Sequence, residues 1–293
     1  LGYFSIPAGE FSLNPFAGEG FNALGIRNNL RVISQLTIIA LGAGLLIIAG
    51  EFDLSIGSMI GFAGACMAMI LRWGFSIVIP YLSFEGGLHI EFFTLIHIPD
   101  VSPLGAIGIT LCFTLFFGWL QGFIVVKSGL PSFIVTLAML FILRGATLAL
   151  TRLITGRTQV PGLRVLIEND PLAWIFATDT FKWVFTWLGS MNLIDLRTDG
   201  TPLATGIPPS VIWFIFFAIV ATWILMKTRY GNWIFASGGD KNGANNVGVP
   251  VGKVKIGLFI GTAVASTVFA TIQVLDAGSA DTMRGTLKEL EAI

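Results

Sequence analysis

Two carboxylates interrupt an apolar stretch in residues 50–58, GEFDLSIGS. Charged side chains are costly in or near hydrocarbon, so we expect Glu51 and Asp53 to lie at a membrane face, line a cavity or be paired. Asp53 also fits a helix N-cap, in which a side-chain oxygen accepts hydrogen bonds from free backbone N–H groups. The alternative is a broken helix facing a translocation path, built from Glu51, Asp53, Ser55 and Gly57.

Arg144 is a further charge inside an apolar run. If a helix begins near Pro131, Arg144 lies about 20 Å along it at a rise of 1.5 Å per residue. Its guanidinium could pair with a carboxylate inside the bundle, or its side chain could extend outward to the membrane surface. The sequence favours the outward conformation.

Residues 228–255 form a polar segment, rich in Gly and Asn, between two long uncharged runs. Its basic residues, counting the one directly before it, are Lys227, Arg229, Lys241, Lys253 and Lys255. They stand against a single acid, Asp240, and the positive-inside rule places such a segment in the cytoplasm. We expect this segment to meet the partner that supplies energy.

Signatures of an enzyme are missing from the sequence. Neither GxxxxGK[ST] nor GxGxxG occurs, so the chain has no phosphate-binding loop of its own, and we predict no cofactor. His89 and His97 lack Cys or carboxylate neighbours at metal-ligand spacing, so we predict no metal site. The net charge of zero gives no reason to expect nucleic acid as a partner. If a nucleotide supplies energy, another subunit must bind it.

Composition limits the fold class. Hydrophobic residues make up 54% and charged residues 12% of the chain, and the mean hydropathy is +0.82. Such a chain has too little polar surface for a water-soluble globule. Six apolar runs reach or approach the roughly 20 residues that cross ~30 Å of hydrocarbon as a helix. These runs are residues 32–50, 54–71, 101–126, 128–143, 200–226 and 256–275. We therefore predict an all-α, polytopic transmembrane helical bundle embedded in the lipid bilayer.

The basic segment also fixes the orientation of the other connections. With residues 227–255 in the cytoplasm, alternation of the spans places residues 84–100 and 152–208 outside. It places the two carboxylates of the first motif toward the cytoplasm. Arg27 and Arg31 then lie outside, on the face that the positive-inside rule disfavours.

Residues 152–208 are balanced in charge, with five basic and five acidic side chains. The segment is dense in aromatic residues: Trp174, Phe176, Phe181, Trp183, Phe185 and Trp187. Trp rings prefer the membrane interface, so we expect short helices at the outer surface of the bilayer. A docking surface for an external partner is the alternative.

Small residues recur at four-residue spacing directly after the carboxylate motif, at Gly57, Gly61 and Ala65. Such a stripe lets two helix backbones approach closely. It indicates tight helix packing and says nothing about a substrate.

Three segments together resemble the permease subunits of bacterial sugar ABC importers of the ribose/xylose type. They are GEFDLSIGSMIGFAGA at residues 50–65, GLPSFIVTLAMLFILRGATL at 129–148, and RYGNWIFASGGDKNGANNVGVPVGKVKIG at 229–257. Their order and spacing match the family, and the ending GTLKELEAI is similar to a further family motif. The resemblance covers most of the chain.

The resemblance implies a core of two permease chains, a second copy or a paralogue, in the bacterial inner membrane. It also implies a cytoplasmic ATP-binding subunit and an external solute-binding protein. Each permease would have roughly ten helices, so we expect this chain to be a fragment with about six. We treat residues 1–293 as a single transmembrane permease domain, with an external interfacial segment at 152–208 and a cytoplasmic coupling loop at 227–255.

In this family a short coupling helix docks on the ATPase, and the matching positions here are about residues 238–247. The coupling residues implied are Gly238, Gly239, Asp240, Asn242, Ala244 and Val247. We expect the glycine pair to bend the chain, Asp240 to cap the helix that follows, and residues 242–247 to present a small-residue surface.

The resulting hypothesis is an ATP-driven permease subunit for a monosaccharide or similar small polar solute. Many sugar permeases have Gly where this chain has Glu51, which leaves the solute open. One alternative is an ion- or proton-coupled secondary transporter, with Glu51, Asp53 and Arg144 as coupling charges. Another is an ABC permease for branched-chain amino acids or nucleosides.

Overall fold

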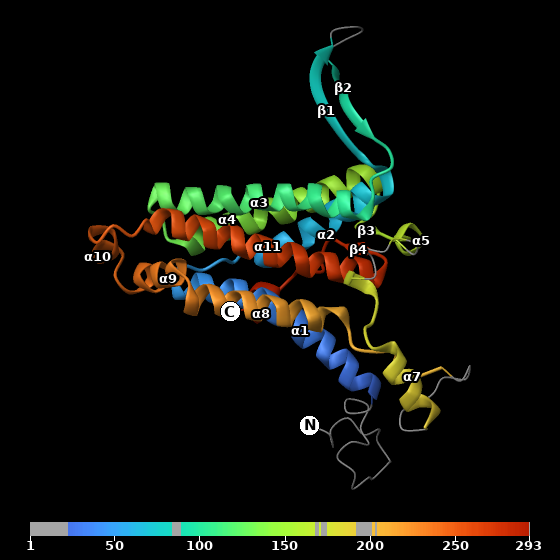
Figure 1. Cartoon of the computed structure of the whole chain (residues 1–293). Helices are drawn as coiled ribbons and strands as arrows, with labels where there is room; N and C mark the ends of the chain where they lie inside the picture. The colour runs from blue at the N-terminus through green and yellow to red at the C-terminus, as the bar shows by residue number, and fades with distance from the viewer. Residues whose placement is uncertain are drawn as a thin grey trace, which may run out of the picture.

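The structure is a computed structural model that describes residues 23–83, 89–167, 170, 175–191, 201–202 and 204–292. Within these residues six helices are long and apolar enough to cross a membrane. They are α1 (Ala23–Ile48), α2 (Ile56–Trp73), α3 (Pro103–Ser128), α4 (Ser132–Thr155), α8 (Pro209–Lys227) and α11 (Val251–Ala277). The predicted helical bundle with six spans is confirmed (Figure 1). Most of the helices extend beyond the predicted runs, because a helix continues through charged residues at its ends that a search for uncharged runs excludes.

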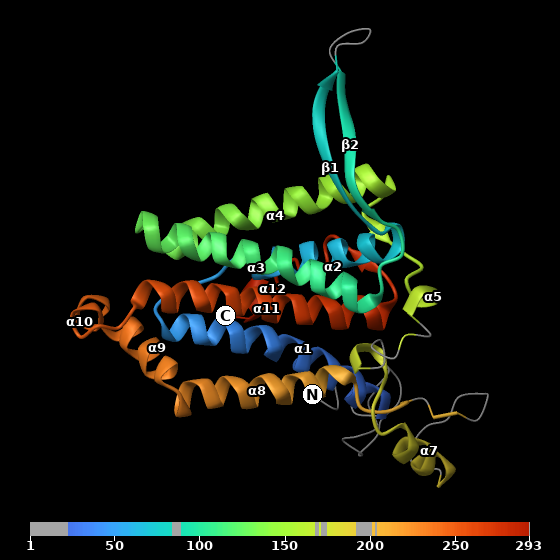
Figure 2. The ribbon, with the colours of Figure 1, turned by 45° about the horizontal axis from the view of Figure 1, so that its top comes forward.

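Helix α11 lies in the middle of the bundle, between α3 on one side and α1 and α8 on the other (Figures 1 and 2). Its closest approach to α3 depends on glycine. A Cβ built at Gly118 would lie 2.8 Å from Ala263 Cβ and 2.9 Å from the Phe259 carbonyl oxygen. Missing side chains at such positions allow close backbone packing between membrane helices.

The small-residue stripe of α2 faces the C-terminal part of the chain. A Cβ at Gly61 would lie 2.9 Å from the Thr282 carbonyl oxygen, and one at Gly57 would overlap the Glu289 carboxylate and the Gly285 carbonyl oxygen. The predicted close contact is therefore present at both glycines. Its partner includes the segment before α12 (Lys288–Ala292) rather than another spanning helix alone.

A two-stranded ribbon follows α2, where the sequence predicted only an outer loop. Strands β1 (Phe75–Ser83) and β2 (His89–Ile98) are antiparallel, with Phe75 opposite Ile98 and Ser83 opposite His89. Figures 1 and 2 show the ribbon rising from the end of the bundle that is far from α10 (Lys241–Asn246). Both strands are rich in β-branched and aromatic residues, which favour strands. Each strand is shorter than a membrane-spanning helix, so a search for apolar runs of that length does not detect it.

Short elements make up the described part of residues 152–208. They are β3 (Gln159–Val160), α5 (Arg164–Ile167) and α7 (Lys182–Ser190), and β3 pairs with β4 (Ala280–Asp281). Trp183 and Trp187 on α7 are 73% and 54% exposed, as expected of an aromatic surface. Phe176 stacks on Trp213 of α8, with ring centroids 4.8 Å apart. Trp174 lies outside the described residues.

The two ends of the bundle carry different elements. Helices α9 (Arg229–Gly239) and α10 lie at one end, and the ribbon, α5 and α7 lie at the other (Figure 1). Which end faces the cytoplasm stays a prediction. The two arginines that the predicted orientation disfavours are both neutralised by acids. Arg27 makes a bidentate ion pair with Asp179, and Arg31 pairs with Asp276.

Candidate functional site

The chain is not helical between α1 and α2. We call residues 49–55 the α1–α2 linker. Two of its backbone amides are satisfied by side chains of α4: Phe52 N donates to Ser132 Oγ at 2.9 Å and Leu54 N to Thr136 Oγ1 at 3.1 Å. Non-helical backbone at membrane depth requires such partners, because no water replaces the missing helical bonds.

The linker enters the interior of the bundle. Asp53 contacts Gln121 of α3 and Thr262 of α11. At 1.5 Å per residue these partners lie about 10 Å from the end of α3 and about 16 Å from the start of α11. The predicted interruption of the first helical pair is therefore real, and it places a carboxylate well inside the protein.

Asp53 is 4% exposed and accepts hydrogen bonds from four donors. Ser55 N lies 2.9 Å and Ser55 Oγ 2.6 Å from its Oδ1 atom. Gln121 Nε2 lies 3.0 Å and Thr262 Oγ1 2.7 Å from its Oδ2 atom. Ser55 Oγ is also 2.9 Å from Gln121 Oε1, which closes the network. Buried carboxylates are stable only with such partners.

Capping does not account for Asp53. The N-cap residue of α2 is Ser55, and its own side chain makes no capping hydrogen bond. Asp53 instead accepts from the backbone N–H of Ser55. Asp53 and Ser55, at 4% and 0% exposure, are enclosed by α3 and α11 in this conformation and do not face open space. The carboxylate thus holds three segments together.

Glu51 is paired with an opposite charge, which is one of the arrangements that the sequence analysis expected for this carboxylate. Its carboxylate makes an ion pair with Lys255 of α11, and the two side chains are 12% and 9% exposed. The pair borders a cavity of about 400 Å³ that Lys241 and Asn245 of α10 also line. Sequence reasoning missed Lys255 as a partner, because 204 positions separate it from Glu51.

The predicted capping of the coupling segment is present. Asp240 is the N-cap of α10 and accepts from Asn242 N at 3.0 Å. Val247 directly after α10 is 80% exposed, and Asn242 is exposed too. Ala244 is 5% exposed and faces the protein, so it does not contribute to the expected small-residue surface. Figure 1 shows α10 at the tip of the bundle.

The glycine pair before Asp240 does not bend the chain as expected. Gly238 and Gly239 are the last two residues of α9, and the direction changes at Asp240, where the backbone becomes extended. Gly238 has another role: a Cβ there would overlap the Ile48 carbonyl oxygen at the end of α1. A Cβ at Gly239 would meet no described atom within 4 Å. Close packing between α9 and α1 therefore requires the first glycine only.

Tyr230 ties α9 to α11 at the same end of the bundle. Its hydroxyl donates to the Val254 carbonyl oxygen at 2.9 Å. Burial raises the pKa of the Tyr230 phenol, so it remains a neutral donor at physiological pH.

Arg144 points toward a carboxylate, against the outward conformation that the sequence favoured. Its guanidinium lies 3.9 Å from Glu289 Oε1, and the two side chains are 27% and 9% exposed. The other carboxylate oxygen of Glu289 is buried and has no hydrogen-bond partner among the described residues. The sequence analysis did not identify Glu289 as a site residue. The signal that could have found it is an acidic residue between apolar neighbours in the ending GTLKELEAI.

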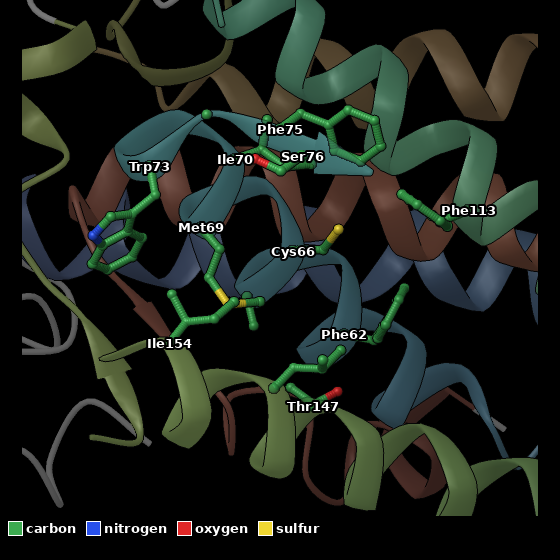
Figure 3. Close-up of a pocket in the computed structure, with 13 residues that line it drawn as sticks. Phe62, Cys66, Met69, Ile70, Trp73, Phe75, Ser76, Phe113, Thr147 and Ile154 are labelled. Carbon is green, nitrogen blue, oxygen red and sulfur yellow. The ribbon is translucent and has the colours of Figure 1, made fainter. Parts of the chain in front are cut away.

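An apolar cleft of about 410 Å³ lies between α2, α3 and α4 (Figure 3). Its lining includes Phe62, Cys66, Met69, Trp73, Phe113 and Ile154. The hydroxyls at its wall are already engaged: Thr147 donates to the Leu143 carbonyl oxygen, and Ser76 bonds to His97 Nδ1. This cleft offers little to a solute that needs several hydrogen bonds.

A second cavity, of about 470 Å³, opens near α5 and α7, and its lining is about half polar. Its charged lining residues are Arg27, Arg164, Asp179, Lys182 and Asp276. Four separate parts of the chain supply them, which is why no local motif predicts the site. Such a cavity can form hydrogen bonds with a hydroxyl-rich solute or with a protein loop.

Comparisons with known proteins show similarity to transport permeases over most of the chain. The ribose import permease protein RbsC of Escherichia coli (strain K12) is 27% identical over 276 residues, which cover 93% of this chain and 68% of that protein. The xylose transport system permease protein XylH of Haemophilus influenzae (strain ATCC 51907 / DSM 11121 / KW20 / Rd) is 27% identical over 305 residues, covering 94% and 74%. No solved structure matches the chain significantly.

The family described as "Branched-chain amino acid transport system / permease component" matches residues 25–293. Together with the six spans, these matches identify a multi-pass protein of the bacterial inner membrane that is a transport component and not an enzyme. The chain therefore belongs to the family of branched-chain amino acid transport system permease components.

Proposed function

We propose that this chain is the membrane-spanning subunit of an ATP-driven importer for a monosaccharide such as ribose or xylose. The observation that carries the proposal is the similarity to ribose and xylose permeases over more than nine-tenths of the chain. The family match, over residues 25–293, includes the linker, the α10 region and the ending with Glu289. Because the sequence has no phosphate-binding loop, a separate subunit hydrolyses ATP.

The energy is delivered at the cytoplasmic coupling loop, residues 227–255. In this proposal Asp240, Asn242 and Val247 contact the ATP-binding subunit, while Gly238 and Ala244 hold α10 on the bundle. Support comes from the apolar side chain of Val247, which is 80% exposed. Exposed apolar side chains at a protrusion are typical anchors of protein interfaces.

The solute crosses beside the α1–α2 linker. Glu51, Asp53, Ser55 and Gly57 belong to the moving wall of the path, which rearranges as access alternates between the two sides. Their burial in this conformation fits a closed state. Arg144 with Glu289 forms a second charged contact at the same wall.

The external solute-binding protein docks on residues 152–208. The cavity lined by Arg164 of α5 and Lys182 of α7 is the outer opening of the path, and the exposed rings of Trp183 and Trp187 belong to the same helix as Lys182. A second permease chain, identical or paralogous, completes the path from the opposite side.

Reconstitution of the full-length permease tests the proposal. The permease, its ATP-binding subunit and its solute-binding protein are placed in proteoliposomes, and uptake of labelled ribose, xylose and leucine is measured with and without ATP. We expect uptake of one of the two sugars that requires ATP. A permease that retains no ATP-binding subunit in mild detergent, and takes up sugar with a proton or sodium gradient alone, would be a secondary transporter.

Branched-chain amino acids are a second candidate class, because the matching family carries that description. Uptake of leucine without uptake of either sugar would assign the chain to this class. ATP dependence would be the same in both cases, so the labelled solute alone separates them.

A further inference from the structure

Both neighbours of α10 contact the α1–α2 linker. On the α9 side, Gly238 lies against the end of α1, and a Cβ built at Gly50 would lie 3.6 Å from Gly238 Cα. On the α11 side, Lys255 makes its ion pair with Glu51. The linker is therefore held from the segment before α10 and from the segment after it (Figure 2).

These two neighbours are also tied to each other and to α10. The Tyr230 hydroxyl of α9 bonds to the Val254 carbonyl oxygen, one residue from Lys255. Val249 N donates to the Ala244 carbonyl oxygen at 2.9 Å, which fixes the exit of α10. A displacement of α10 thus moves the start of α11 with it, and Lys255 moves too.

The other side of the linker leads to the bundle interior. Asp53 lies two residues beyond Glu51, about 7 Å away along an extended chain. Its carboxylate holds Gln121 of α3 and Thr262 of α11. A displacement of Glu51 therefore also displaces Asp53. The hydrogen bonds of Asp53 form the only buried side-chain network of the linker among the described residues.

We propose that the Glu51–Lys255 ion pair is the positioning contact through which movement of α10 reaches the Asp53 network. The inference rests on the proposed coupling function of α10. Both side chains are largely buried, so separating them leaves an uncompensated charge in a poorly solvated site. The pair consequently stays together while α10 moves, as a rigid link must.

Charge substitutions in the assembled transporter test this role. Glu51→Gln and Lys255→Gln each remove the attraction, and the swap Glu51→Lys with Lys255→Glu restores it with reversed polarity. Lys127→Gln is the matched control, because Lys127 at the end of α3 is exposed, lies outside residues 227–255 and has no ion-pair partner among the described residues. The measured quantity is solute transported per ATP hydrolysed in proteoliposomes.

We expect each neutralising variant to lower this ratio at least fivefold while the ATP-binding subunit remains bound. The swap should recover at least half of the parent ratio, and Lys127→Gln should equal the parent. Loss of bound ATP-binding subunit in the parent itself would instead refute the proposed function, before any variant is made.

Two results would overturn the ion pair's role: neutralising variants that couple normally, or a swap that assembles yet transports no better than they do. If the neutralising variants do not accumulate in the membrane, the swap alone decides, because only a paired charge can rescue both assembly and coupling. A swap that also fails to accumulate would contradict the proposal, since restored attraction is its stated requirement.

Discussion

At the scale of single residues, the carboxylates of the first motif differ in what holds them. Asp53 is satisfied by neutral donors from three segments, whereas Glu51 is neutralised by one cation. A hydrogen bond to a charged group contributes roughly 1.5–3 kcal/mol, and a buried charge left alone costs more than it contributes when paired. Each carboxylate is thus fixed by its partners rather than by its position in the sequence.

The glycine pair at the end of α9 gives a residue-scale prediction. Gly238→Ala places a Cβ on the Ile48 carbonyl oxygen, which is backbone and cannot move aside, so we expect a lower midpoint of thermal unfolding. Gly239→Ala meets open space at a helical position and should be neutral or stabilising by up to about 1 kcal/mol. Thermal unfolding of the purified permease measures both variants. Equal effects at the two positions would show that the close contact with α1 does not matter.

At the scale of elements, the short helix α10 combines a stable fold with an exposed apolar tip. Asp240 caps the start of α10, Ala244 is buried against the rest of the protein, and Val247 is exposed to solvent. An N-cap contributes typically about 1 kcal/mol, which is a large share for a helix of this length. The element can therefore present a side chain to a partner without relying on that partner to fold.

A charge placed on this tip tests the interface. Val247→Asp adds a carboxylate to a surface that we expect to be covered by the ATP-binding subunit, so retention of that subunit should fall at least tenfold, or about 1.4 kcal/mol. Thermal unfolding of the isolated permease should not change, because Val247 is 80% exposed. Ser128→Asp is the control for added charge at an exposed position outside residues 227–255. Undiminished retention in Val247→Asp would remove Val247 from the interface.

At the scale of the whole molecule, the two ends of the bundle are held by different interactions. The end that carries α9 and α10 is joined by the Glu51–Lys255 pair and the Gly238 contact. The end that carries α5 and α7 is joined by ion pairs from α1, which connect Arg27 to Asp179 and Arg31 to Asp276. Helix α1 therefore takes part in contacts at both ends of the bundle.

Removing the outer connection should loosen the outer segment alone. Arg27→Ala deprives Asp179 of its bidentate partner, and the aspartate side chain is only 8% exposed. We expect faster hydrogen exchange in residues 175–191, with no change in α9 and α10. Arg157→Ala is the matched control, because Arg157 is exposed. Identical exchange in the two variants would contradict a structural role for the Arg27–Asp179 pair.

The sequence by itself determined the membrane environment, the six spans, the interruption at residues 50–55 and the capping of α10 by Asp240, because hydropathy, charge bias and N-cap preference are local properties. Only the tertiary structure decided the partners of the charges: Lys255 for Glu51, Glu289 for Arg144, and Gln121 with Thr262 for Asp53. These partners lie 68 or more positions apart in sequence, and the depth and rotation of packed helices select them. The role of Gly238 was misjudged for the same reason, since a glycine that relieves a contact with a distant backbone looks identical in sequence to one that bends a chain.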